Sequence, residues 1–152
     1  MMAPTWGWTI QPCRDGETFL LAEPYHHDLQ ITAGRHRLPD VEAALTKYAG
    51  VYRVTIDAGF EFDGASIPKL FWNIAPPMTG RHTHASLLHD WLYATHKIQV
   101  LDEDGEFETR VCERELADLV FLQVMQEDGV RKDLRETMWG AVRNHGRGAW
   151  SD

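Results

Sequence analysis

Two hydrophobic patterns divide the chain. Up to about residue 62, short apolar runs alternate with polar residues, which is typical of half-buried strands. Beyond residue 82, apolar positions recur every three or four residues, which is typical of amphipathic helices. The predicted strands lie at residues 6–10, 18–22, 51–56 and 60–62. The predicted helices lie at residues 83–96, 113–127 and 130–145.

Two segments of the first part depart from the strand pattern. Residues 40–48 predict a short helix with Asp40 as its N-cap, because a carboxylate can accept hydrogen bonds from the first free amides of a helix. His26, His27 and Asp28 follow Pro24 and are predicted to lie in an exposed turn.

Turn signals complete the predicted layout. Asp104-Gly105 predicts a hairpin over residues 98–111, between the helices at 83–96 and 113–127. Residues 63–80 are rich in Gly and Pro yet apolar, and a loop of this kind is predicted to pack over the fold or to build a site. The expected fold class is α+β: a β-rich N-terminal part, an apolar loop, and then helix, hairpin, helix and helix. One domain, residues 1–152, is expected from this length.

Composition excludes several classes of protein. The formal charge of −8 leaves no basic surface for nucleic acid. No apolar run reaches the roughly 18 residues of a transmembrane helix. The N-terminus lacks the basic and apolar segments of a signal peptide, so secretion by that route is not expected. Cys13 and Cys112 are too far apart in sequence to indicate a disulfide framework or a zinc motif.

The candidate catalytic and metal-binding residues lie on the predicted helices at 83–96 and 113–127. His89 and Asp90 are neighbours, and Tyr93 follows one turn after His89 on the same face. If the hairpin returns the next helix antiparallel, Asp118 approaches the His89 ring. A carboxylate on one ring nitrogen fixes the tautomer and leaves the other nitrogen to take a proton from water. Asp90 is then the candidate metal ligand, for a hard cation also held by loop carbonyls.

A structural interpretation of the same residues stays open. His89 can be a buried core residue bonded to Asp118, with Asp90 exposed. Arg114 lies four residues before Asp118 and can pair with it along the helix, whereas Arg143 suits a helix C-terminus or an anionic group.

Other polar candidates are weaker. His82, His89 and His96 are seven residues apart, about 10.5 Å along a helix, which is too far for one zinc ion. Ser66 lacks the strand–turn–helix setting of a nucleophile elbow and is expected to bond the loop backbone. Asp63 lies in a turn that can face the site.

Four sequence blocks resemble domain-of-unknown-function family 1353, a family of phage and prophage proteins. The blocks are FDGASIPKLFW (62–72), LLHDWLY (87–93), ELADLVF (115–121) and AVRNHGRGAW (141–150). The resemblance implies a bacteriophage or prophage origin, and hence a place in the virion or in the cytoplasm of the infected bacterium. It implies no activity, because the family has none assigned.

A more distant resemblance concerns the helices alone. H-D-x-x-Y on one helix, followed by A-D-x-x-F on the next, is similar to phospholipase A-two, in particular the cysteine-free form of parvovirus capsids. It implies that His89 activates water, that Asp90 holds Ca²⁺, and that Tyr93 and Asp118 orient His89. The glycine-rich calcium loop of that superfamily is replaced here by PPMTG at residues 76–80.

Two functions are therefore expected from the sequence. The first is a phage-encoded hydrolase with a His89–Asp118 pair, acting on an envelope ester such as phospholipid, with or without a metal. The alternative is a non-enzymatic virion component of the tail, baseplate or head that contacts other virion proteins. An early protein that binds a host factor is a third class, which no motif favours.

Overall fold

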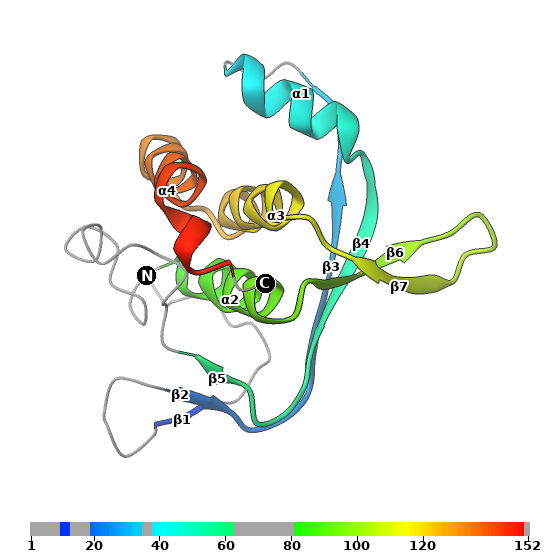
Figure 1. Cartoon of the computed structure of the whole chain (residues 1–152), viewed down its shortest axis with the longest axis vertical. Coiled ribbons are helices and arrows are strands. Elements are labelled where there is room, and N and C mark those ends of the chain that lie inside the picture. Colours follow the sequence, from blue (N-terminus) through cyan, green and yellow to red (C-terminus); the bar gives the residue numbers. More distant parts are fainter. Residues whose placement is uncertain (1–9, 13–18, 35–37, 63–80, 151–152) are drawn as a thin grey trace.

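The computed structural model describes residues 10–12, 19–34, 38–62 and 81–150, and Figure 1 shows their arrangement. The strands are β1 (Ile10–Pro12), β2 (Phe19–Leu21), β3 (Tyr25–Ile31), β4 (Gly50–Ile56), β5 (Glu61–Phe62), β6 (Lys97–Leu101) and β7 (Phe107–Val111). The helices are α1 (Pro39–Lys47), α2 (Thr83–Thr95), α3 (Arg114–Glu127), α4 (Lys132–His145) and the short 3-10 helix η2 (Gly146–Gly148). The predicted α+β layout is confirmed.

The described strands form two antiparallel sheets. The larger has the order β3-β4-β6-β7, and the smaller has the order β1-β2-β5. On β4, the side chains of Tyr52, Val54 and Ile56 are buried, whereas Arg53 and Thr55 point the other way. One face of the larger sheet can therefore cover a core while the other stays polar.

Helices α2 and α3 lie on that apolar face, and α4 packs on α3 (Figure 1). Helix α2 is buried along almost its whole length, from Thr83 to Asp90. Its polar side chains are thus placed in the core, where each needs a hydrogen-bond partner.

The hairpin of β6 and β7 extends away from the helices (Figure 1). The Asp102 carboxylate accepts hydrogen bonds from the amides of Asp104 and Glu106, each 2.9 Å long. Gly105 has φ 82°, a conformation that glycine adopts without strain. The Asp-Gly turn and the predicted hairpin are confirmed.

Two predictions in the first part were wrong. Helix α1 begins at Pro39 with Leu38 as N-cap, so Asp40 lies inside the first turn and makes no capping hydrogen bond. Proline at the first helical position places the N-cap two residues earlier than the carboxylate indicated. His26, His27 and Asp28 lie in β3 rather than in a turn, paired with β4.

Some predictions fall outside the described residues. The tryptophans of the first predicted strand, Trp6 and Trp8, are among them, as is the loop 63–80 with Asp63 and Ser66. In the part of the chain that the structure describes, no helix is both long and apolar enough to cross a membrane.

Candidate functional site

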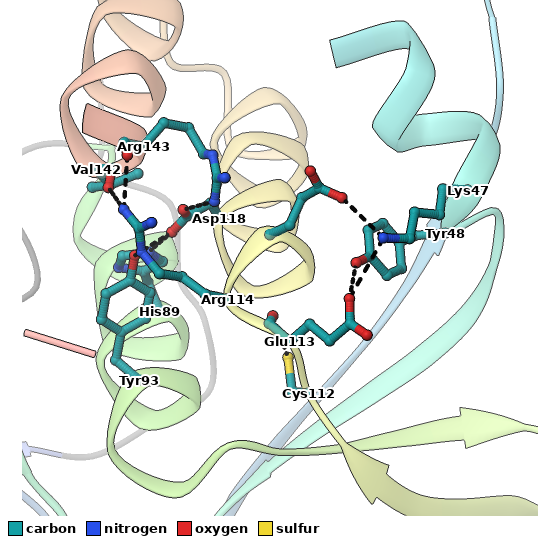
Figure 2. A network of polar contacts seen from close by, with 11 residues as sticks. Lys47, Tyr48, His89, Tyr93, Cys112, Glu113, Arg114, Asp118, Val142 and Arg143 are labelled. Carbon is teal, nitrogen blue, oxygen red and sulfur yellow. Dashed lines mark hydrogen bonds and ion pairs between the residues drawn. The ribbon is translucent and has the colours of Figure 1, made fainter. Parts of the chain in front are cut away.

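His89 and Asp118 meet between α2 and α3, as Figure 2 shows. The distance from His89 Nε2 to Asp118 Oδ1 is 2.7 Å, and both side chains are 0% exposed. The hairpin reverses the chain, so the two helices run antiparallel. The middle of α2, with His89, therefore faces the first half of α3, with Asp118. The contact predicted from the sequence is therefore present. The catalytic role of the pair stays a prediction.

Tyr93 joins the pair from one turn further along α2. Its hydroxyl donates a hydrogen bond of 2.5 Å to the same oxygen, Asp118 Oδ1. The rings of His89 and Tyr93 are 4.1 Å apart at their centroids, and Phe121 of α3 lies 4.7 Å from His89. Two aromatic neighbours and one carboxylate thus fix the orientation of the imidazole.

Two arginines surround the carboxylate. Arg143 on α4 donates from Nη1 to Asp118 Oδ2 at 2.7 Å. Arg114 instead donates from Nη2 to the carbonyls of Val142 and Arg143, at 2.6 and 2.8 Å, and from Nε to the Tyr93 hydroxyl at 3.3 Å. Among the described residues, the ion pair of Asp118 is therefore made by Arg143 rather than along the helix by Arg114. Arg114 thus adds a side-chain donor at the last carbonyls of α4, of which that of Val142 also accepts a hydrogen bond from the amide of Gly146.

These contacts set the ionisation of the site. Burial alone would raise the pKa of Asp118, but hydrogen bonds and charge from His89, with further bonds from Tyr93 and Arg143, hold the pKa below its ordinary value. Burial, and then the charge of Asp118, raise the pKa of Tyr93, so its hydroxyl stays protonated. An ionised Asp118 can only accept a hydrogen bond, so Nε2 of His89 carries a proton.

Asp90 follows His89 on α2 and is 8% exposed. Neighbours on a helix point about 100° apart, so Asp90 faces a different direction from His89. Calcium takes about 6–8 oxygen ligands, of which one carboxylate supplies at most two. Across residues 10–12, 19–34, 38–62 and 81–150, no group of three or more His, Cys, Asp or Glu side chains is placed to hold a metal ion. The metal at Asp90 stays a prediction.

A second histidine cluster lies nearer the start of α2. His84 Nδ1 is 2.7 Å from Asp128 Oδ2, and His84 Nε2 is 2.9 Å from the Tyr25 hydroxyl. His27 lies edge-on to His84 at 4.8 Å, and its Nε2 is 3.1 Å from Glu127. Sequence reasoning missed this cluster because the segment around His27 was assigned to a turn. The alternation from Tyr25 through His27 and Leu29 is the signal that could have placed it on a strand.

The end of the chain packs against Tyr93. A Cβ atom added to Gly146 would lie 2.8 Å from the Tyr93 hydroxyl, so only glycine fits there without movement of that ring. Trp150 meets Tyr93 edge-on at 5.0 Å and stacks on His96 at 3.8 Å. These residues support the site, although nothing in their local sequence placed them beside it.

Comparison with known families gives one finding. A family model described as a protein of unknown function (DUF1353) matches residues 41–142. The chain belongs to the DUF1353 family. The matched span contains His89, Asp90, Tyr93 and Asp118, and it ends one residue before Arg143. Comparisons with curated proteins and with solved structures give no match. The likeness to phospholipase A-two therefore stays a resemblance of motifs.

Proposed function

We propose that this DUF1353 protein is a phage- or prophage-encoded hydrolase in which His89 and Asp118 activate water. The proposal is carried by one observation, the 2.7 Å contact between His89 Nε2 and an Asp118 carboxylate that Tyr93 and Arg143 also bind. A carboxylate that is oriented by two further donors can orient an imidazole in turn.

The proposed reaction uses Nδ1 of His89 as the general base. Nδ1 takes a proton from water while the water oxygen forms a bond to the carbonyl carbon of an ester. The tetrahedral intermediate then breaks its bond to the leaving alcohol, and the imidazolium returns the proton to that oxygen. Asp118 remains ionised throughout and stabilises the positive charge on the ring. Phospholipid of the bacterial envelope is the leading substrate, from the resemblance of the His89–Tyr93 motif.

The complete burial of His89 and Asp118 sets a condition on this mechanism. Water and ester can reach Nδ1 only if the protein opens on that side of the ring. The same burial fits a structural role of the pair, as the second candidate, a non-enzymatic virion component, would require. In that role the pair would stabilise the packing of α2, α3 and α4 and would meet no substrate.

Vesicle hydrolysis separates the two candidates. Purified protein is incubated with vesicles of phosphatidylethanolamine and phosphatidylglycerol, and released fatty acid is measured in calcium and in EDTA. The hydrolase predicts release that falls by about 10²–10⁴-fold in His89→Asn, the contribution usual for a general base. His84→Asn is the matched control, because it changes a buried histidine of the same helix outside the proposed centre. Activity in calcium alone that is lost in Asp90→Asn would support the metal prediction.

Absence of hydrolysis by folded wild-type protein in either buffer would contradict this substrate. Equal activity in wild-type protein and His89→Asn would contradict the proposed base. Mass spectrometry of purified phage particles tests the second candidate. A protein absent from particles at stoichiometric level is not a virion component.

A further inference from the structure

A cavity of about 710 Å³ lies among α1, α3 and α4. Ligand sites for small molecules usually measure about 300–1,000 Å³, so this volume is sufficient. Part of its wall is small or apolar, with Gly140 and the half-buried Trp139 on α4. The rest is charged, with residues from all three helices. The charged residues are Asp40, Lys47, Glu115 and Arg143.

Arg143 connects this cavity to the His89–Asp118 pair. Its Nη1 binds Asp118, while the side chain is 28% exposed and lines the cavity. A guanidinium has five N–H donors in a planar fork, so one guanidinium can bind a buried carboxylate and an anionic ligand at the same time. The cavity therefore presents, at its α4 side, a guanidinium that Asp118 holds in place and that has further N–H donors for a ligand.

The remaining charges determine which ligand fits. Lys47 lies 3.5 Å from Glu115, so these two lining charges compensate each other. Asp40 is left as an anion on α1. The charge of Arg143 is balanced by Asp118, but its guanidinium keeps further N–H donors for a ligand on the α4 side. A simple anion would be repelled by Asp40, and a simple cation would leave these donors without an acceptor. A ligand that carries both charges can bind Arg143 through its anionic group and Asp40 through its cationic group.

We propose that this cavity binds a small zwitterion, with a phosphate or carboxylate at Arg143 and an ammonium group at Asp40. Trp139, on the α4 side, also lines the cavity, and aromatic rings bind ammonium groups. The ligand is either a free metabolite or the headgroup of a lipid, since both carry this chemistry. The assignment goes beyond the hydrolase proposal and holds whether or not the chain is an enzyme.

Isothermal titration calorimetry on the full chain tests the site. The zwitterionic probes are phosphoethanolamine and phosphocholine, and the singly charged probes are inorganic phosphate and choline. We expect saturable binding of at least one zwitterion, with at least tenfold higher affinity than either singly charged probe. Equal affinity for phosphate and for the zwitterions would overturn the proposal, and so would absence of binding by all four.

Two substitutions locate the binding in the cavity. A Cβ atom at Gly140 meets no atom within 4 Å, so larger side chains fit there without displacing the protein. Gly140→Leu takes up part of the volume at the α4 wall, one turn from Arg143, and should weaken binding at least tenfold, whereas Gly140→Ala leaves nearly all of the volume and should retain binding. Asp40→Asn should weaken zwitterion binding about tenfold and strengthen phosphate binding. Unchanged affinity in Gly140→Leu would place the ligand elsewhere and overturn the assignment.

A sedimentation experiment then identifies the source of the zwitterion. Protein that binds soluble phosphocholine is mixed with phosphatidylcholine vesicles and centrifuged. Co-sedimentation that Gly140→Leu weakens assigns the cavity to a lipid headgroup. Protein that stays in the supernatant assigns it to a free zwitterion.

Discussion

The helix pair α2–α3 is bridged twice by a histidine and an aspartate, and the two bridges differ. His89 and Asp118 meet in the dry core, where Asp118 is bound through its second oxygen by Arg143. His84 and Asp128 meet toward the end of the pair, where Asp128 is 12% exposed. The first carboxylate contacts Nε2 of its histidine, and the second contacts Nδ1.

The two bridges differ in which member is held by further protein groups. Both ring nitrogens of His84 bind protein groups, Asp128 on one side and Tyr25 on the other. This imidazole links β3 to two helices and is suited to holding them together. In the first bridge the additional donors act on the carboxylate, so Asp118 is held as a rigid acceptor for Nε2 of His89. Asp118 thereby orients the His89 ring, which is what the proposed hydrolase requires of it.

The largest effect is expected from removal of the buried carboxylate. Asp118→Ala leaves His89, Tyr93 and Arg143 without their shared acceptor, which should lower the free energy of unfolding by about 3–5 kcal/mol. Asp128→Ala, at the wetter bridge, should cost about 1–3 kcal/mol, because water can replace part of the lost bond. Urea denaturation of both variants measures the difference. Equal losses would show that burial does not distinguish the two bridges.

The packing around the first bridge gives the next effect. Gly146→Ala places a methyl group 2.8 Å from the Tyr93 hydroxyl, so Tyr93 or the end of α4 must move. Overpacking of this kind costs about 1–3 kcal/mol. Gly148→Ala is the matched control, since a Cβ atom there meets nothing within 4 Å. Thermal melts of the two variants that coincide would contradict this close approach.

The sequence predicted the first bridge and missed the second for a physical reason. Helical periodicity and the Asp104-Gly105 turn are local signals, and together they imply an antiparallel helix pair with Asp118 near His89. The pairing of Tyr25 with His84 depends on where β3 lies against α2, which no local pattern specifies. A strand was mistaken for a turn, so its partners could not be predicted.

Long-range packing also explains the two arginines. Arg114 and Asp118 are four residues apart, so the sequence favoured a pair within the helix. The docking of α4 instead brings Arg143 to Asp118 and lets Arg114 reach the last carbonyls of α4. Gly146 beside Tyr93 belongs to the same contact. Only the position of α4 on α3 decides these interactions, and it is fixed by the shape of both surfaces.

The charge of Asp118 predicts a specific pH dependence. The folded pKa of Asp118 is lowered relative to an unfolded value of about 3.9, so its ionised form stabilises the native state. This stabilisation is complete above the unfolded pKa and is lost as the pH falls through the lower folded pKa. The stability difference between wild-type protein and Asp118→Asn should therefore be constant near neutral pH and should shrink below about pH 4. Urea denaturation from pH 7 to pH 3 measures it. A difference that grows at acid pH would contradict the lowered pKa.

The smallest effects should come from the two tyrosine hydroxyls. That of Tyr93 binds the aspartate of the first bridge, and that of Tyr25 binds the histidine of the second. Tyr93→Phe removes a donor to Asp118, and Tyr25→Phe removes the partner of His84 Nε2. Each should cost about 0.5–1.5 kcal/mol, because the ring and its packing remain. Only Tyr93→Phe should also raise the pKa of Asp118, since one of the hydrogen bonds that favour the carboxylate is lost. NMR titration of the Asp118 carboxyl carbon in both variants checks this. A shift of equal size in Tyr25→Phe would mean that the two bridges are electrostatically coupled along α2.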